Sequence, residues 1–174
     1  VTISDSVTTI GSYAFYRCTE LTTVTIPDGV TTIGNGVFCD CRGLTTITIP
    51  DSVTTIGDYA FSGCTGLTTI TIPDSVTIIG KRAFEGSTGL SKVVLEGSPD
   101  IGYGAFYGCT AITSIELLGE SIPDLTYLLF SCRDLLTNVT IGDSVTTIGQ
   151  STFQGCTGLT KVVLEGSPAI YYNN

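Results

Sequence analysis

The amino-acid sequence predicts a repeat solenoid, in which one short coil of chain is stacked many times along an axis. One 23-residue segment, ITIPDSVTTIGDYAFSGCTGLTT at 47–69, recurs almost unchanged on both sides of itself. All seven phenylalanines take the same place in the repeat, and Val, Ile and Thr dominate its periodic segments. Those residue types favour strands over long helices. A unit this short cannot bury its own apolar face, whereas stacked copies cover one another.

Seven units follow one another, and an eighth is partial. Their bounds are 1–23, 24–46, 47–69, 70–92, 93–114, 115–138 and 139–161, followed by 162–174. The segment GLSKVVLEGSP at 89–99 returns as GLTKVVLEGSP at 158–168, which indicates that a block of three units was duplicated. We expect residues 1–174 to form a single repeat array that is a piece of a longer chain.

Each unit is predicted to contain a strand that is buried on one side only. In LTTITIP at 44–50, the leucine and the isoleucines alternate with Thr46 and Thr48, as a half-buried strand requires. Pro50 ends the strand because it has no N–H to donate to a ladder.

A tight turn and a second, shorter strand follow. PDS at 50–52 has the composition of a turn, and VTTI at 53–56 can point its valine and isoleucine inward. Beyond a glycine, DYAFSGC at 58–64 is long enough for one helical turn, with its alanine, phenylalanine and cysteine on the inner face.

Stacking is expected to align equivalent residues of successive units into columns that form the structural core. The predicted phenylalanine column contains Phe15, Phe38, Phe61, Phe84, Phe106, Phe130 and Phe153. The predicted cysteine column contains Cys18, Cys41, Cys64, Cys109, Cys132 and Cys156, with Ser87 in the fourth unit.

Composition argues against several classes of function. The net charge is −9 with only seven Lys and Arg, too few to form the basic stripe that nucleic-acid binding needs. No apolar run approaches the roughly 20 residues of a membrane-spanning helix. The chain has no His, so it lacks the usual Ser–His and Cys–His nucleophile pairs, and its carboxylates follow the repeat instead of pairing. We expect no enzyme activity and no cofactor.

The repeated pattern L-x-x-V/I-x-I-P-x-S/G-V-T-x-I-G-x-x-A-F-x-x-C-x-x-L resembles the BspA-like leucine-rich repeat, over the whole chain. The resemblance implies a right-handed solenoid of leucine-rich-repeat type, with a parallel β-sheet on one face and short strands and single helical turns on the other. Family members are typically surface or secreted proteins of anaerobic bacteria and some parasitic protists, and they are linked with adhesion. The resemblance therefore implies an extracellular or cell-surface location.

Two units depart from the pattern. In the fifth, LEGSPDIG replaces IPDSVTTIG. In the sixth, the chain is longer before Phe130 and one residue shorter between Phe130 and Cys132. We expect the array to bend or bulge near 95–135, where the register of the columns is hardest to predict.

The outward residues of the strand face are the predicted binding surface, because solenoids usually bind partners on such a face. Thr is also simply a good solvent-facing strand residue, so a purely structural interpretation stays open. The predicted binding residues are Thr23, Thr25, Thr46, Thr48, Thr69, Thr71, Lys92, Glu116, Thr140 and Lys161.

The cysteines are predicted to be buried free thiols, since one cysteine per coil does not converge in pairs as a disulfide requires. The same spacing lacks the paired cysteines of a zinc site, so no metal site is expected. Cys39, an extra thiol beside Cys41, is a candidate for an exposed, reactive group.

A carboxylate column is predicted at the first turn of the units. Each Asp is expected to accept its own turn N–H, and calcium bridging is the alternative. The column contains Asp5, Asp28, Asp51, Asp74 and Asp143.

The sequence thus predicts a non-catalytic adhesion module that binds an extracellular protein or glycan through its strand face. One alternative is a spacer or self-associating stalk, because no polar cap is evident and uncapped solenoid ends expose strand edges. The other alternative is a targeting domain joined to an enzyme.

Overall fold

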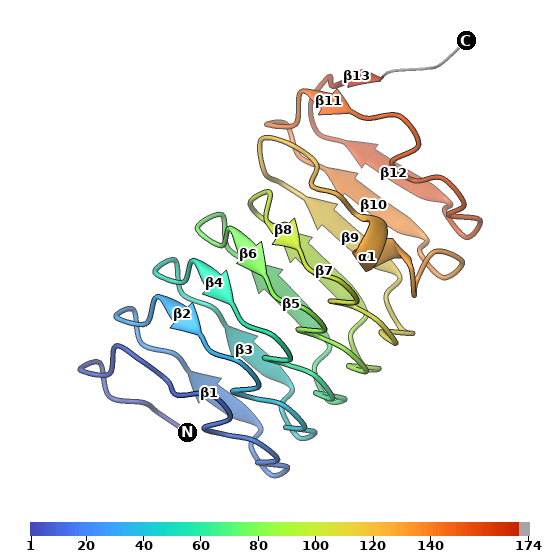
Figure 1. Ribbon diagram of the computed structural model, residues 1–174. Coiled ribbons are helices and arrows are strands. Elements are labelled where there is room, and N and C mark those ends of the chain that lie inside the picture. The colour runs from blue at the N-terminus through green and yellow to red at the C-terminus, as the bar shows by residue number, and fades with distance from the viewer. Residues whose placement is uncertain (171–174) are drawn as a thin grey trace.

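A computed structural model of the chain describes residues 1–170 and confirms the repeat solenoid (Figure 1). Parallel coils are stacked along one axis, with longer strands on one side and shorter strands on the other. The last four residues of the partial unit 162–174 lie outside the described residues.

The longer strands form the face that was predicted from the L-x-x-V/I-x-I pattern. They are β1 (Thr23–Thr25), β3 (Thr46–Thr48), β5 (Thr69–Ile72), β7 (Lys92–Leu95), β9 (Ser114–Leu117), β10 (Asn138–Ile141) and β12 (Lys161–Leu164). β1 pairs with β3, and the other five strands form one sheet in the order β5-β7-β9-β10-β12. All of these pairs are parallel.

The shorter strands form the opposite layer. They are β2 (Thr32–Ile33), β4 (Thr55–Ile56), β6 (Ile78–Ile79), β8 (Asp100–Ile101), β11 (Thr147–Ile148) and β13 (Ala169–Ile170). β2, β4, β6 and β8 form one sheet, and β11 pairs separately with β13. The helix α1 (Thr126–Leu129) stands in the sixth coil, between these two groups.

The irregular units disturb the two layers unequally. On the long-strand side the register runs through without a shift, from Lys92 to Ser114, then to Asn138 and Lys161. The expected irregularity near 95–135 is therefore confined to the short-strand side and the turns around α1.

The core lies between the two layers, and its most regular feature is a stack of phenylalanines. The rings of Phe15, Phe38, Phe61, Phe84 and Phe106 lie nearly parallel, with neighbouring centroids 5.4, 5.4, 5.2 and 4.9 Å apart. The spacing follows that of strands in a sheet, because each coil contributes one ring.

The predicted cysteine column forms a second ladder, held by hydrogen bonds. The thiol of Cys64 donates to the carbonyl oxygen of Phe38 at 3.1 Å, and the thiol of Cys109 donates to that of Phe84 at 3.0 Å. In the fourth unit the hydroxyl of Ser87 donates to the carbonyl of Phe61 at 2.8 Å. Serine therefore replaces cysteine here because the position requires a small side chain that can donate.

The segment after each short strand differs from the predicted helical turn. Within residues 1–170, α1 is the single α-helix. In the third coil, every second backbone N–H donates to a carbonyl of the next coil, as the N–H of Phe61 does to Ala83. The N–H groups that lie between them donate within their own coil and close tight turns, as the N–H of Ser62 does to Tyr59. The left-handed φ of Tyr59 (57°) and of Gly63 (70°) lets the chain alternate in this way. Bonds between coils thus replace bonds along a helix.

The sixth coil corrects one prediction, because Phe130 is not in the phenylalanine column. Its side chain is 67% exposed, while Leu129 is buried. Phe130 precedes Cys132 by two residues and Phe106 precedes Cys109 by three, so counting back from the cysteine assigns the core position to Leu129. The short spacing, which is visible in the sequence, decides which side chain is buried here, and the identity of the ring does not.

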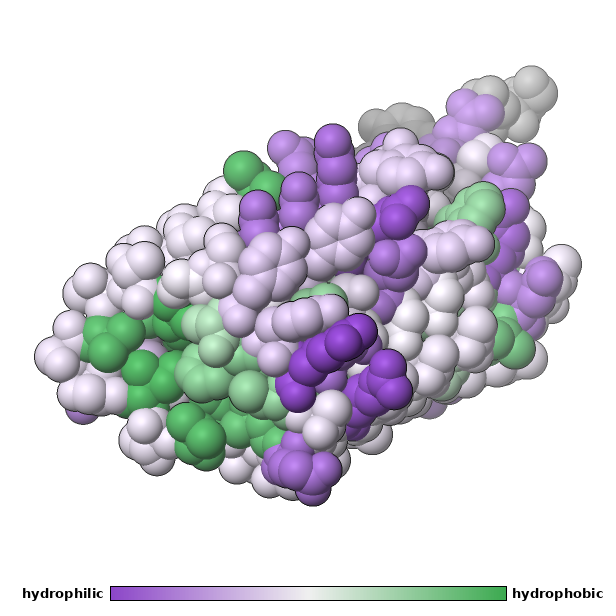
Figure 2. All heavy atoms as spheres, turned by 60° about the horizontal axis from the view of Figure 1, so that its bottom comes forward, coloured by the Kyte–Doolittle hydropathy of each residue, from purple (hydrophilic) through white to green (hydrophobic). Residues whose placement is uncertain are grey.

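The terminal coils also correct the predicted columns. Phe15, Phe153 and Cys156 are half-buried, and Cys18 is exposed. These side chains occupy the predicted positions, but within this chain fewer coils cover them. Figure 2 shows the hydrophobic surface that results on the first coil.

Candidate functional site

The predicted strand face is a regular, flat surface. Thr23, Thr25, Thr46, Thr48, Thr69, Thr71 and Lys161 are exposed, and Lys92, Glu116 and Thr140 are half-buried. The ammonium of Lys92 lies 2.7 Å from the carboxylate of Glu116 on the neighbouring strand. The charges of these two predicted binding residues therefore neutralise each other across β7 and β9. Val94, which pairs with Glu116 in register, is buried.

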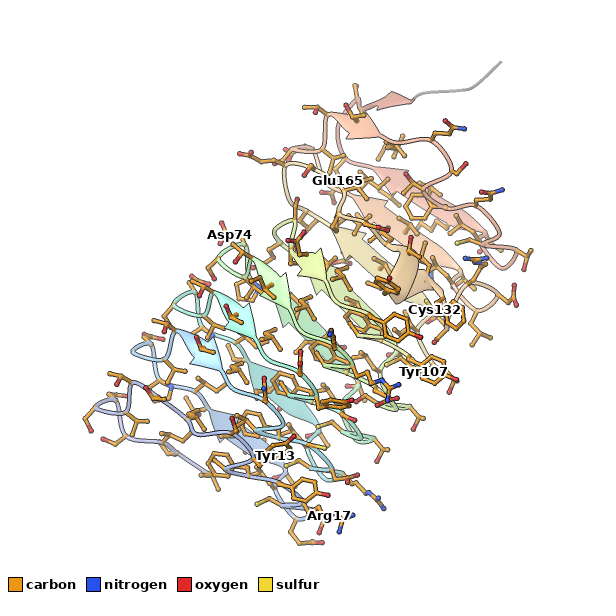
Figure 3. The ribbon with its side chains drawn as sticks, viewed as in Figure 1. Tyr13, Arg17, Asp74, Tyr107, Cys132 and Glu165 are labelled. Carbon is orange, nitrogen blue, oxygen red and sulfur yellow. The ribbon has the colours of Figure 1, made fainter. Side chains whose placement is uncertain are left out.

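The carboxylate column lies along one edge of the solenoid, where Figure 3 labels Asp74. The turn N–H groups do not require these side chains, since Val53 donates to the Pro50 carbonyl at 3.0 Å and Val76 to the Pro73 carbonyl at 3.1 Å. The expected Asp turn bond is replaced by a backbone bond. Within residues 1–170, no three His, Cys, Asp or Glu side chains gather closely enough to hold a metal ion.

The thiols are all free, and burial governs their chemistry. Burial raises the pKa of the Cys41 thiol to about 11 and of the Cys132 thiol to about 12. Cys39 is half-buried, and burial together with the nearby Asp40 carboxylate also raises its pKa. A raised pKa lowers the thiolate fraction, which argues against Cys39 as a reactive nucleophile.

The structure reveals a surface feature that the sequence analysis missed, a group of aromatic side chains in the fifth and sixth coils. We call Tyr103, Tyr107, Tyr127 and Phe130 the aromatic patch. Tyr103, Tyr107 and Phe130 are 63%, 53% and 67% exposed. Figure 3 shows Tyr107 on the edge of the solenoid opposite Asp74 and Glu165. Large exposed apolar groups that cluster in this way mark interaction sites.

The rings of the aromatic patch contact one another in two pairs. Tyr103 and Tyr127 pack edge to face, with centroids 5.4 Å apart and planes at 71°. Tyr107 and Phe130 lie 6.2 Å apart and are tilted by 30°. These contacts limit the motion of the exposed rings, so this surface is partly organised in the chain by itself.

A hollow of about 610 Å³ lies among these rings, and its lining is mostly apolar. We call it the Gly104 hollow. It is lined by Arg82, Tyr103, Gly104, Tyr107, Thr126, Tyr127 and Phe130. Its volume falls within the range of ligand pockets, about 300 to 1,000 Å³.

Gly104 forms the floor because it stands where other coils carry a large residue. Tyr13, Tyr59 and Arg82 occupy this place in the first, third and fourth coils, all with φ between 54° and 60°. Gly104 has the same left-handed backbone, with φ 65° and no side chain. A Cβ there would lie 3.5 Å from Arg82 Cγ and 3.7 Å from Tyr107 Cβ, which are ordinary contacts.

Two signals in the sequence could have revealed the patch. Tyr107 and Phe130 each stand two residues before the cysteine of their coil, at the place that Ser62 and Glu85 take in other coils. The short Phe130 to Cys132 spacing marks the same outward shift. Neither signal shows that tyrosines from two coils meet, because that depends on how α1 packs.

A second hollow, of about 760 Å³, lies between α1 and the seventh coil. Its lining is more polar and includes Asp124, Arg133, Gln150 and Gln154. It lacks the exposed rings of the aromatic patch, so the patch and the Gly104 hollow remain the candidate site.

Comparison with known proteins agrees with the repeat and the fold. A family model described as the BspA type leucine rich repeat region, in six copies, matches residues 1–100 and 96–173. The chain belongs to the BspA-type leucine-rich-repeat family. No curated protein sequence matches this BspA-type chain.

Solved structures resemble this BspA-type solenoid over nearly its whole length. The leucine-rich-repeat protein of T. pallidum is 26% identical, with a TM-score of 0.65, and the match covers 94% of this chain and 68% of that one. The pneumococcal vaccine antigen PcpA is 19% identical, with a TM-score of 0.72, and the match covers 96% of this chain and 41% of that one. The likeness to PcpA therefore concerns the fold alone. Within residues 1–170, no helix of the chain is long and apolar enough to span a membrane.

Proposed function

We propose that this chain is a non-catalytic recognition module of a surface protein, and that it binds an extracellular protein or glycan through the aromatic patch. The observation that carries the proposal is the exposure of Tyr103, Tyr107 and Phe130, each more than half exposed, at one place on the solenoid. Interfaces are enriched in tyrosine, phenylalanine and arginine, and a few such side chains supply most of the binding energy.

The fold favours this use of the patch. The coil that carries Tyr103 and Tyr107 is fixed to the fourth coil by hydrogen bonds such as that from the Gly86 N–H to the Tyr107 carbonyl. It is fixed to the sixth coil by the bond from the Gly108 N–H to the Ser131 hydroxyl at 3.0 Å. A tyrosine presents a large contact area with few rotatable bonds, so ordering it on binding costs little entropy. A rigid patch of this kind therefore loses less free energy on binding than a flexible loop.

The location and the absence of catalysis are parts of the proposal. A surface location follows from the resemblance to BspA-like proteins, and the family assignment supports a repeat protein of that type. The lack of any His supports a non-catalytic role. The strand face, which the sequence favoured, stays a second candidate surface of the same module.

The test compares the two surfaces on one panel of immobilised matrix proteins and glycans. One variant carries Tyr107→Ala and Phe130→Ala, and both residues are exposed, so the fold should be kept. The control variant changes Thr46, Thr48, Thr69 and Thr71 to Lys on the strand face.

We expect the aromatic variant to lose about 30-fold in affinity, the equivalent of ~2 kcal/mol for a central interface residue, while the threonine variant keeps its binding. Loss in the threonine variant alone would move the site to the strand face. If the folded parent chain binds nothing on the panel, the proposal is wrong and the spacer interpretation replaces it.

A further inference from the structure

We infer that the Gly104 hollow receives an extended segment of a partner protein, which inserts an aromatic side chain over Gly104 and pairs a neighbouring Asp or Glu with Arg82. This inference rests on the proposed function and names the partner class of the same site. It follows from the shape of the hollow, from its charge and from the residue that stands at its rim.

The shape favours one large, flat side chain. The equivalents of Gly104 on either side are Arg82 in the fourth coil and, counted back from the cysteine, Tyr127 in the sixth. The missing side chain at Gly104 therefore leaves a gap between two large ones, with Tyr103 and Tyr107 lining it as well. An aromatic ring from a partner would restore the side chain that the first and third coils carry at this place.

The length of the hollow suits an extended chain. Its lining comes from three successive coils, and coils in a parallel stack are ~4.8 Å apart, so it spans roughly 10 Å along the axis. An extended segment rises about 3.3 Å per residue, so about three residues cover that distance. The aromatic residue and the acidic residue should therefore lie within two positions of each other.

The charge favours a carboxylate on the partner. Among the described residues that line the hollow, Arg82 is the only charged one, although the whole chain has a net charge of −9. Its guanidinium lies 3.5 Å from the Glu85 carboxylate, and the Arg82 side chain is 44% exposed. This long, exposed pair leaves donors on the guanidinium free for a second carboxylate, which arginine binds with a fork of parallel hydrogen bonds.

A protein segment fits the lining better than a glycan does. The most exposed ring belongs to Phe130, which has no polar atom to offer to sugar hydroxyls. Outside the tyrosine hydroxyls, the polar side chains of the lining are Arg82 and Thr126. The core of a protein interface is typically rich in aromatic residues and arginine and poor in lysine and acidic residues, and the lining of the hollow has this composition.

The test uses a displayed library of random nine-residue peptides, with a glycan array in parallel. The blocking variant is Gly104→Tyr, which fills the hollow with a residue that Tyr13 and Tyr59 show to be compatible with this backbone. The charge variant is Arg82→Gln. Its matched control is Arg17→Gln, an exposed arginine with φ 58° on the first coil. Thermal melts establish that each variant is folded.

We expect enriched peptides to carry Phe, Tyr or Trp within two positions of Asp or Glu. Their affinity should fall at least 10-fold with Gly104→Tyr and with Arg82→Gln, and it should be unchanged with Arg17→Gln. Replacing the peptide's acid with its amide should weaken binding to the parent chain but not weaken binding to Arg82→Gln any further.

Three results would overturn the inference. Enriched peptides without an acidic residue, or with equal affinity for Gly104→Tyr, would reject the stated contacts. Glycan binding that Gly104→Tyr abolishes, without peptide enrichment, would keep the proposed function and reject the partner class. If neither library yields a binder that depends on the patch, both the inference and the proposed site are wrong.

Discussion

Replacement of Ser87 tests the idea that the cysteine column is a ladder of hydrogen-bond donors. Ser87 is fully buried, and its hydroxyl donates to the carbonyl of Phe61 at 2.8 Å. That carbonyl accepts one other bond, a long one of 3.4 Å from the N–H of Cys64. Ser87→Ala therefore leaves a buried carbonyl poorly satisfied, while Ser87→Cys restores the donor that other coils use.

The magnitude follows from the cost of a lost buried hydrogen bond. Removing one partner of such a bond costs about 1 to 3 kcal/mol, and the remaining long bond from Cys64 places Ser87→Ala near the lower end. For a chain of this size, each kcal/mol lowers the melting temperature by about 2 to 4 °C. We expect Ser87→Ala to melt a few degrees below the parent, and Ser87→Cys to lie within about 0.5 kcal/mol of it, since a buried thiol also behaves as a small hydrophobe.

The assay is thermal and urea unfolding followed by circular dichroism, under reducing conditions. Thr88→Ala, at the exposed neighbouring position, is the matched control and should change little. If Ser87→Ala is as stable as the parent chain, the hydrogen bond contributes nothing. Equal destabilisation by Ser87→Ala and Ser87→Cys would show that size, and not donation, decides the residue at this position.

Three further predictions follow from the core, the thiols and the strand face. Leu129→Ala should cost about 2 to 5 kcal/mol because Leu129 is buried, whereas Phe130→Ala should change stability by less than about 0.5 kcal/mol; the reverse order in urea unfolding would reject the reassigned column. Burial raises the pKa of the Cys109 thiol from its ordinary value of 9.0 to about 12, so the folded chain keeps a proton that the unfolded chain loses. Stability from this thiol is therefore intact below pH 9 and is lost between about pH 9 and 12, and Cys109→Ser should show a smaller alkaline decrease in unfolding free energy than the parent. Lys92→Glu alone should destabilise the chain by up to about 1 kcal/mol, and adding Glu116→Lys should restore most of it; no recovery in the double variant would show that the 2.7 Å pair is not a stabilising contact.

The regular part of the fold could be predicted because each coil repeats the same local rules. The alternation of Thr46 and Thr48 with apolar residues fixed the strand face, and Pro50 fixed its end. The identical spacing of Phe38 and Phe61 fixed the stack of rings. In a solenoid each coil contacts its neighbours only, so a local pattern is enough to predict the packing.

The helical turns and the position of Phe130 could not be predicted from the same rules. A segment such as 58–64 satisfies its N–H groups either along a helix or with the next coil, and only the neighbouring coil decides between them. Phe130 has the identity of a core residue but the spacing of a surface one. The buried position belongs to Leu129, which precedes Cys132 by three residues as Phe106 precedes Cys109.

By itself, then, the sequence determined the solenoid, its strand faces and its buried columns, since these depend on periodicity and on nearest neighbours. Only the tertiary structure decided where the proposed binding surface lies. The aromatic patch needs Tyr103 and Tyr107 from one coil beside Tyr127 and Phe130 from the next, with Gly104 leaving the space between them. That arrangement depends on how the irregular sixth coil packs around α1, so the repeated sequence pattern does not predict it.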